Sequence, residues 1–189
     1  MIKQALAALV SKDRSPHIAL VEQIAALIKP RVYLEVGVYR CSTINRVAKH
    51  ASTAIGVDIN QDALSHARGK NIETVHGDLN VARPSLEKYR GLIDLAFIDG
   101  DHRIESLRSD FELLSPYVSN SAAILIHDTW PGTREYSSDL YCSNSYLFPN
   151  EINDAVDRMW SAATLAAHPG LTMVTRRGIL PSWCDQVSS

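Results

Sequence analysis

The sequence predicts an α/β protein built on a doubly wound, mostly parallel sheet with helices on both faces. Two observations lead to this prediction. Short apolar runs alternate with segments of helical periodicity from about residue 30 to residue 128, which is the pattern of βαβ units. Most of these runs are nearly continuously hydrophobic, as is typical of strands that helices cover on both sides. The length of 189 residues fits one such domain.

The elements follow in order along the chain. Apolar residues recur at helical spacing over residues 2–10 and 17–28, and Pro30 ends the second helix. Five strands are expected, at residues 32–36, 53–57, 72–75, 93–98 and 122–126. Crossover helices are expected between them, at residues 42–50, 61–69, 84–90 and 103–115. Near the C-terminus we expect a helix over residues 150–167 and two short strands joined by a tight turn, at 171–175 and 178–180.

Composition argues against several classes of protein. Nineteen basic and 21 acidic residues nearly balance, which disfavours a surface made for nucleic acid or anionic lipid. No apolar run reaches the 18 or so residues that a membrane span needs. Cys41, Cys142 and Cys184 lie far apart and form no C-x-x-C pair, so neither a zinc site nor a disulfide framework is predicted. We therefore expect a soluble, cytoplasmic protein.

Acidic residues stand at the ends of the predicted strands. Glu35, Asp58, Asp78 and Asp99 close or follow the first four strands, and Asp128 follows the fifth. Acids occur in such loops for turn chemistry alone. However, the carboxyl ends of parallel strands meet at one edge, where doubly wound sheets bind their ligands. Five acids at one edge therefore predict a ligand site.

The first turn indicates what the ligand is. A dinucleotide site needs G-x-G-x-x-G, but after Gly37 this chain has Tyr39 and Ser42 at the other two glycine positions. Glu35 also places negative charge where a phosphate would be repelled. The edge suits a cationic ligand without phosphates, such as S-adenosylmethionine. Asp58 is then placed to accept from both ribose hydroxyls, and Asp78 from the adenine amino group.

Five motifs resemble the class I S-adenosylmethionine-dependent methyltransferases. They are residues 34–40 (LEVGVYR), 56–58 (GVD), 76–78 (HGD), 97–102 (FIDGDH) and 126–129 (IHDT). The I-D-G-D-H box is similar to that of the small metal-dependent O-methyltransferases of the cephalosporin-hydroxylase-like and macrolide-sugar group. The resemblance implies a Rossmann-like core at residues 30–128, after N-terminal helices at 1–29. It implies a cofactor site made by Glu35, Gly37, Val38, Tyr39, Asp58, Asp78 and Asp99.

The same resemblance implies a divalent cation, Mg²⁺, that binds the acceptor hydroxyl. Asp99 and Asp128 end neighbouring strands, and two adjacent carboxylates repel unless a cation or proton lies between them. His127 is the third candidate ligand, with a packing role as the alternative. The resemblance places a general base at His102, since imidazole accepts a proton near neutral pH; the alternative is a residue that caps its own helix. Asp101 is expected to be an N-cap.

The region after the core is expected to recognise the methyl acceptor, a hydroxyl-bearing small molecule. Residues 129–149 form a long, aromatic-rich connection, predicted as an acceptor lid with an anchored surface loop as the alternative. Residues 150–189 hold the last helix and strands. The remaining histidines, at positions 17, 50, 66, 76 and 168, show no ligand spacing and are expected at the surface or in satisfied positions.

Two other functions stay open. A nucleotide-sugar transferase could use Asp99-Gly100-Asp101 as a metal-binding D-x-D, although Glu35 and the missing glycines argue against a diphosphate. A binding module of the same fold without catalysis is the second alternative. The sequence leaves the oligomeric state open, a homodimer included.

Overall fold

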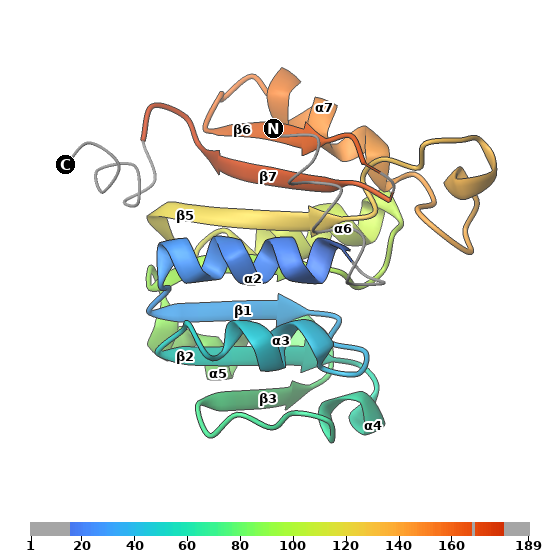
Figure 1. Cartoon of the computed structure of the whole chain (residues 1–189). Coiled ribbons are helices and arrows are strands. Elements are labelled where there is room, and N and C mark those ends of the chain that lie inside the picture. Colours follow the sequence, from blue (N-terminus) through green and yellow to red (C-terminus); the bar gives the residue numbers. More distant parts are fainter. Residues whose placement is uncertain (1–15, 168, 180–189) are drawn as a thin grey trace, which may run out of the picture.

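A seven-stranded sheet runs through the computed structural model, which describes residues 16–167 and 169–179 (Figure 1). The strand order is β3-β2-β1-β4-β5-β7-β6. The five parallel strands are β1 (Val32–Val36), β2 (Thr53–Asp58), β3 (Ile72–His76), β4 (Ile93–Ile98) and β5 (Val118–His127). Two antiparallel strands, β6 (Trp160–Leu165) and β7 (Leu171–Arg176), extend the sheet beyond β5. The predicted fold class is confirmed.

Helices cover both faces of this sheet (Figure 1). One face carries α2 (Pro16–Ile28) and α3 (Ser42–Val47), and the other carries α5 (Leu79–Leu86) and α6 (Ile104–Leu114). The short α4 (Gln61–Leu64) follows β2, and α7 (Phe148–Asp154) packs against β6. Three 3-10 turns complete the elements: η1 (Glu87–Tyr89), η2 (Glu135–Ser137) and η3 (Ser145–Leu147).

The alternation of side chains in β1 shows why the predicted strands read as nearly continuous hydrophobics. Leu34 and Val36 face a core shared with α5 and α6, whereas Tyr33 faces a second core that contains Val21 and Ala25 of α2. Both faces of the strand are therefore removed from water, and no polar position is needed along it.

The helix after β3 begins earlier than predicted. It starts at Leu79, because Asp78 takes the N-cap position and its Oδ1 accepts from the Val81 amide at 3.0 Å. The predicted start at residue 84 was wrong. The expected helices at 42–50 and 61–69 form but are shorter, ending at Val47 and Leu64.

The C-terminal prediction was wrong in two respects. The helix expected over residues 150–167 ends at Asp154, and residues 160–165 form β6 instead. Of the second strand expected at 178–180, residues 178 and 179 are not a strand and Gly178 forms a turn with Arg177, while residue 180 lies outside the described residues. The hairpin of the described region is β6–β7. The Asn153 side chain joins the end of α7 to β6. Its Oδ1 accepts from the Ala162 amide, and its Nδ2 donates to the Ala162 carbonyl. The helix expected at residues 2–10 lies outside the described residues.

The turn after β1 packs tightly against the end of β4. Gly37 has a φ of +84°, and a Cβ at this position would lie 2.4 Å from the carbonyl oxygen of Asp99. Two hydrogen bonds fix the same neighbourhood, from the Gly37 amide to the Val57 carbonyl and from the Asp99 amide to the Val36 carbonyl. Glycine is therefore required here by close contact between two strand ends as well as by backbone conformation.

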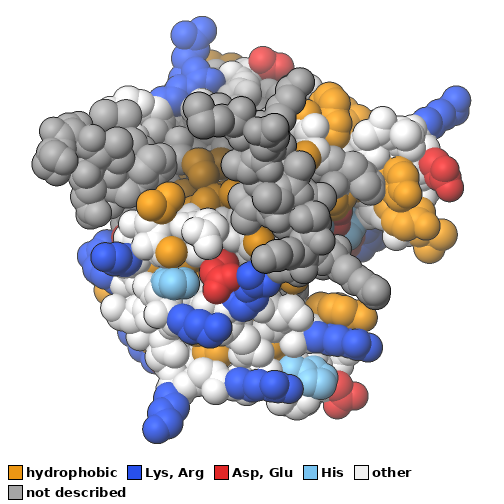
Figure 2. All heavy atoms as spheres, viewed as in Figure 1, with side chains coloured by type: hydrophobic (Ala, Val, Ile, Leu, Met, Phe, Trp, Pro, Cys, Tyr) orange, Lys and Arg blue, Asp and Glu red, His pale blue; other side chains and the backbone are white. Residues whose placement is uncertain are grey.

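Figure 2 shows most of the visible Lys and Arg side chains in the lower half of the view, with acidic and histidine side chains among them. No helix among the described residues has the length and apolar character needed to cross a membrane.

Gly37→Ala should destabilise the protein far more than Gly91→Ala. Gly91 has a similar φ, +71°, but no atom lies within 4 Å of a Cβ placed there. The Gly91 variant should lose about 1 kcal/mol for the left-handed backbone alone. The Gly37 variant should lose at least about 2 kcal/mol more, because Asp99 must move. Urea denaturation measures both, and equal losses would contradict the contact.

Candidate functional site

A cavity of about 740 Å³ opens at the carboxyl ends of β1, β2, β3 and β4. Its wall contains most of the residues predicted to bind a cofactor, namely Gly37, Tyr39, Asp58, Asp78 and Asp99. The cavity lies where the strand order reverses, between β1 and β4, which is where doubly wound sheets bind ligands. Its volume is in the range of small-molecule sites.

Asp58 at the end of β2 organises the turn after β1. Its Oδ2 accepts from the amides of Val38 and Tyr39 at 2.9 and 3.1 Å, and its Oδ1 accepts from the Asn60 amide at 2.8 Å. The Val38 side chain is buried in the core, so Val38 contributes through its backbone amide, which donates to Asp58. These three amides fix the Asp58 carboxylate at the border of the cavity.

Glu35 differs from the expectation of a charged group at the cofactor. It is buried beneath the turn, accepts a hydrogen bond from the Tyr33 hydroxyl at 2.7 Å, and is not among the residues that line the cavity. Burial, together with the charges of Asp99 and Asp58, raises the pKa of Glu35 well above its usual range although the Tyr33 bond opposes this. Burial therefore favours the protonated form of Glu35.

The far wall of the cavity comes from α6, which the sequence analysis did not assign. This wall is lined by Glu105, Ser106, Ser109 and Asp110. Glu105 and Ser109 are four residues apart, as are Ser106 and Asp110, so all four lie on one helix face. Burial, followed by the charges of Asp78 and Asp101, raises the pKa of Asp110 to about 6. The i, i+4 spacing of polar residues in a crossover helix was the signal that could have identified this wall.

Next to the cavity, the ends of β4 and β5 bring together the predicted metal ligands and the predicted base. His127 Nδ1 lies 2.9 Å from Asp99 Oδ1 and 3.3 Å from Asp128 Oδ2. His102 Nε2 lies 2.9 Å from Asp128 Oδ2, while its Nδ1 is hydrogen-bonded to the carbonyl of Tyr141. Asp128 has a φ of +56°, an uncommon conformation for a non-glycine residue that places its carboxylate between the two histidines.

The charges of this group balance one another. The hydrogen bond to Asp128 is the main cause that raises the pKa of His102 to about 8. Burial alone would lower the pKa of His127, but its bonds to Asp128 and Asp99 outweigh burial and raise that pKa to about 10. Burial opposes ionisation of Asp128 as well, yet the two histidines hold its pKa far below the usual value. The raised pKa values favour the charged form of both histidines, which offsets the negative charge of the carboxylates.

Asp101 does not take the N-cap position expected for it. The N-cap of α6 is Arg103, and Asp101 instead accepts from the Arg103 amide and guanidinium and from the Ser106 hydroxyl. The first turn of α6 is capped from outside, because Asn144 Oδ1 accepts from the Ile104 amide at 2.8 Å.

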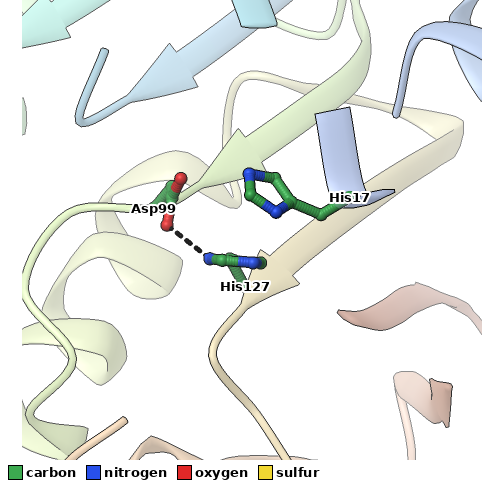
Figure 3. A group of neighbouring side chains, drawn as sticks. All are labelled: His17, Asp99 and His127. Atoms are coloured by element: carbon green, nitrogen blue, oxygen red, sulfur yellow. Dashed lines mark hydrogen bonds and ion pairs between the residues drawn. The ribbon is translucent and has the colours of Figure 1, made fainter. Parts of the chain in front are cut away.

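His17 is a further site residue that sequence reasoning missed (Figure 3). It was expected at the surface or in a satisfied position, but its ring lies over that of His127, with centroids 3.9 Å apart. One ligand atom each from His17, Asp99 and His127 lie within 4.8 Å of one another, as do those of Asp99, His102 and Asp128. The other described histidines lie away from these groups, and His168 is outside the described residues.

The segment at residues 129–147 lies against this group and makes a second cavity. The Ser145 hydroxyl donates to the Asp128 carbonyl at 2.5 Å, and Tyr141 contacts His102 as described above. Trp130, Arg134 and Tyr146 line a cavity of about 730 Å³ together with residues of α7 and β6. Tyr136 and Tyr141 pack edge to face outside it.

Comparisons with known proteins agree with this arrangement. A family model described as a methyltransferase domain matches residues 34–129, which is just over half of the chain. No curated protein matches the chain.

Solved structures share the fold at low sequence identity. The O-methyltransferase TomG from Streptomyces achromogenes, involved in tomaymycin synthesis and solved with SAM, has a TM-score of 0.71 at 15% identity over 92% of this chain and 90% of that one. An O-methyltransferase from Bacillus cereus solved with SAH has 0.68 at 19% identity over 93% and 89%. Cofactor-bound Rv0187 from MTB has 0.69 at 16% identity over 92% and 88%.

The ion pair of His102 predicts a pH-dependent stability. Its pKa is raised to about 8, so the folded chain binds more protons than the unfolded chain between about pH 6.5 and 8. The stabilisation is fully present below about pH 6.5 and is lost as the pH rises through about 8. In metal-free protein, the difference in unfolding free energy between wild type and His102→Gln should therefore shrink by about 1–2 kcal/mol over this range.

Urea denaturation at a series of pH values measures this difference. His66→Gln is the matched control, because that histidine is exposed and lies outside the group. A His102→Gln difference that stays constant with pH would rule out the raised pKa.

Proposed function

The chain belongs to the methyltransferase-domain family, and from this premise we propose that it transfers the methyl group of S-adenosylmethionine to a hydroxyl of a small molecule, assisted by a divalent cation. The observation that carries the proposal is the continuity of two sites at Asp99. This residue lines the cavity beneath the β1 turn and also contacts His127 in the neighbouring group. A cofactor on one side and an acceptor on the other would meet there.

The chemistry of the cavity favours a cationic cofactor. Carboxylates of Asp58, Asp78, Asp99, Asp101 and Asp110 border it. Such a wall repels phosphates and attracts the ammonium and sulfonium groups of S-adenosylmethionine. Asp58, already fixed by three backbone amides, is suited to accept from the ribose hydroxyls, and the far wall with Asp78 and Asp110 to receive the adenine. The structural neighbours solved with SAM or SAH support the same choice.

The group at the ends of β4 and β5 fits a divalent cation. Asp99 and Asp128 offer carboxylate oxygens, and His127, whose Nδ1 lies 2.9 and 3.3 Å from them, is the third candidate ligand. Mg²⁺ accepts such oxygen-rich sites and keeps open positions for substrate oxygens. A cation bound here would act as a Lewis acid that lowers the pKa of the acceptor hydroxyl.

His102 is the proposed proton acceptor, and its surroundings orient it. The Tyr141 carbonyl accepts from Nδ1, which leaves Nε2 as the nitrogen that faces Asp128 and the reaction centre. Once Nε2 is deprotonated, it is the atom that can take the proton of the acceptor hydroxyl. Residues 129–147 hold the ring in place through Tyr141 and so support catalysis as well as acceptor binding.

The second cavity is the proposed place for the body of the acceptor. Trp130 and Tyr146 offer aromatic surface, and Arg134 offers a cation. Trp130 and Arg134 follow Asp128 by two and six residues along the chain. Aromatic walls with a few polar groups are typical of small-molecule sites.

A nucleotide-sugar transferase is disfavoured by two observations. The Asp101 carboxylate of the D-x-D is already engaged by Arg103 and Ser106, and the acidic cavity would repel a diphosphate. The non-catalytic alternative is decided by whether methyl transfer is measured.

Asp58→Asn should weaken the binding of S-adenosylhomocysteine by about 10–100-fold, because a hydrogen bond from the ribose to a charged acceptor is lost. Asp62→Asn is the control, since Asp62 is exposed on α4 and does not line the cavity. Calorimetric titration measures both, with circular dichroism as the check on folding. Unchanged affinity in folded Asp58→Asn would remove Asp58 from the cofactor site.

His102→Ala should lower the turnover of methyl transfer by about 10²–10⁴-fold, the usual contribution of one general base. Its affinity for S-adenosylhomocysteine should stay within about twofold of wild type, because His102 does not line the cofactor cavity. Transfer of a labelled methyl group to a panel of hydroxylated acceptors measures turnover. A rate within about threefold of wild type would return His102 to a purely structural role.

A further inference from the structure

We propose that His17, Asp99 and His127 form a binding site for a divalent transition-metal ion such as Zn²⁺. The three residues come from three elements. His17 lies in the first turn of α2, Asp99 directly follows β4, and His127 ends β5. The inference concerns the ion and its ligands, and it does not depend on methyl transfer.

The geometry of the three side chains suits one shared ion. A ligand atom from each residue lies within 4.8 Å of the other two. Zinc bonds to nitrogen and oxygen are about 2.0–2.2 Å long, so the ligand atoms of a tetrahedral site lie roughly 3.3–3.6 Å apart. The limit of 4.8 Å is wider than this spacing, so the side chains would move closer together when they hold one ion. Figure 3 shows the His17 and His127 rings beside one another with Asp99 at the same end of both.

A second observation also indicates a missing partner. The His127 side chain is 8% exposed, and its Nε2 is buried without a hydrogen bond to any described residue. Leaving a buried polar atom without a partner costs about 1–3 kcal/mol, and native structures seldom do so without an ion or ordered water nearby. Its Nδ1, in contrast, is engaged by Asp99 and Asp128. An ion shared with Asp99 at Nδ1 would take the place of the Nδ1 proton, so its binding would release a proton.

The donor set determines the class of metal. Two imidazole nitrogens and one carboxylate favour zinc and its first-row neighbours, whereas Mg²⁺ prefers oxygen ligands only. Asp128, at 3.3 Å from His127 Nδ1, adds a second negative charge next to the site. The His17–Asp99–His127 group shares Asp99 with the Asp99–His102–Asp128 group. Its donor atoms are mostly nitrogen, whereas those of the second group are mostly oxygen.

The position of His17 is built into the core. Val21 and Ala25 lie further along α2 and are fully buried against the sheet and α3, so the helix cannot slide without exposing them. The first turn of α2 is thereby held beside the ends of β4 and β5, where His127 lies. An ion bound by all three residues would connect this helix to both strands.

The test uses the full chain after treatment with a chelator and dialysis. Calorimetric titration with Zn²⁺ and, separately, with Mg²⁺ is carried out on wild type, His17→Ala, His102→Ala and the control His66→Ala, which changes an exposed histidine outside the group. Visible absorption of bound Co²⁺ reports the donor set. Titration of the same samples with S-adenosylhomocysteine reports the cofactor cavity separately.

We expect one tight Zn²⁺ per chain, at least tenfold weaker binding in His17→Ala with a changed Co²⁺ spectrum, and no change in His66→Ala. Mg²⁺ should bind more weakly than Zn²⁺ in these titrations, because two of the three donors are imidazole nitrogens. Equal Zn²⁺ affinity of wild type and His17→Ala would overturn the proposal, as would a loss confined to His102→Ala, which would assign the ion to the other group. Failure to bind S-adenosylhomocysteine would contradict the proposed function alone and leave the metal result unaffected.

Discussion

The pairing of His127 with Asp99 and Asp128 is the interaction on which the site depends. Two carboxylates from neighbouring parallel strands meet in a partly buried place, where they would repel one another without a positive partner. The imidazole contacts both, at 2.9 and 3.3 Å. Asp128 has an uncommon backbone conformation, and its carboxylate is also paired with His102. Residues 129–147 contact Asp128 through Ser145 and His102 through Tyr141. The part of the site proposed for the acceptor is assembled around this pair.

The sequence predicted the sheet well because the signals are local. Buried parallel strands show as short hydrophobic runs, and the five expected strands all form, β5 being longer than expected. Residues 160–165 were misassigned because their apolar and small residues fit a helix as readily as a strand. Pairing with β7 decided between the two, and that contact is tertiary.

The candidate site was predicted where residues follow strand ends and missed where three-dimensional packing brings residues in. Asp58, Asp99, His102, His127 and Asp128 could be found because topology alone gathers strand ends at one edge. His17 could not, since nothing local indicates that the first turn of α2 reaches β5. Glu35 was placed at the correct strand end, but its side chain points to the α2 side of the sheet, next to Tyr33. The direction of a side chain in a strand buried on both faces cannot be read from a hydrophobic run.

The close packing of Gly37 on Asp99 has a consequence for communication within the enzyme. The β1 turn borders the cavity proposed for the cofactor, and the Asp99 amide donates to the Val36 carbonyl at 2.8 Å at the base of that turn. Since no free space separates the two backbones, a ligand that shifts the turn also shifts the carboxylate that serves the neighbouring group. Ligands bound in the two compartments would therefore both act through Asp99. By thermodynamic reciprocity, each would change the binding affinity of the other by the same factor.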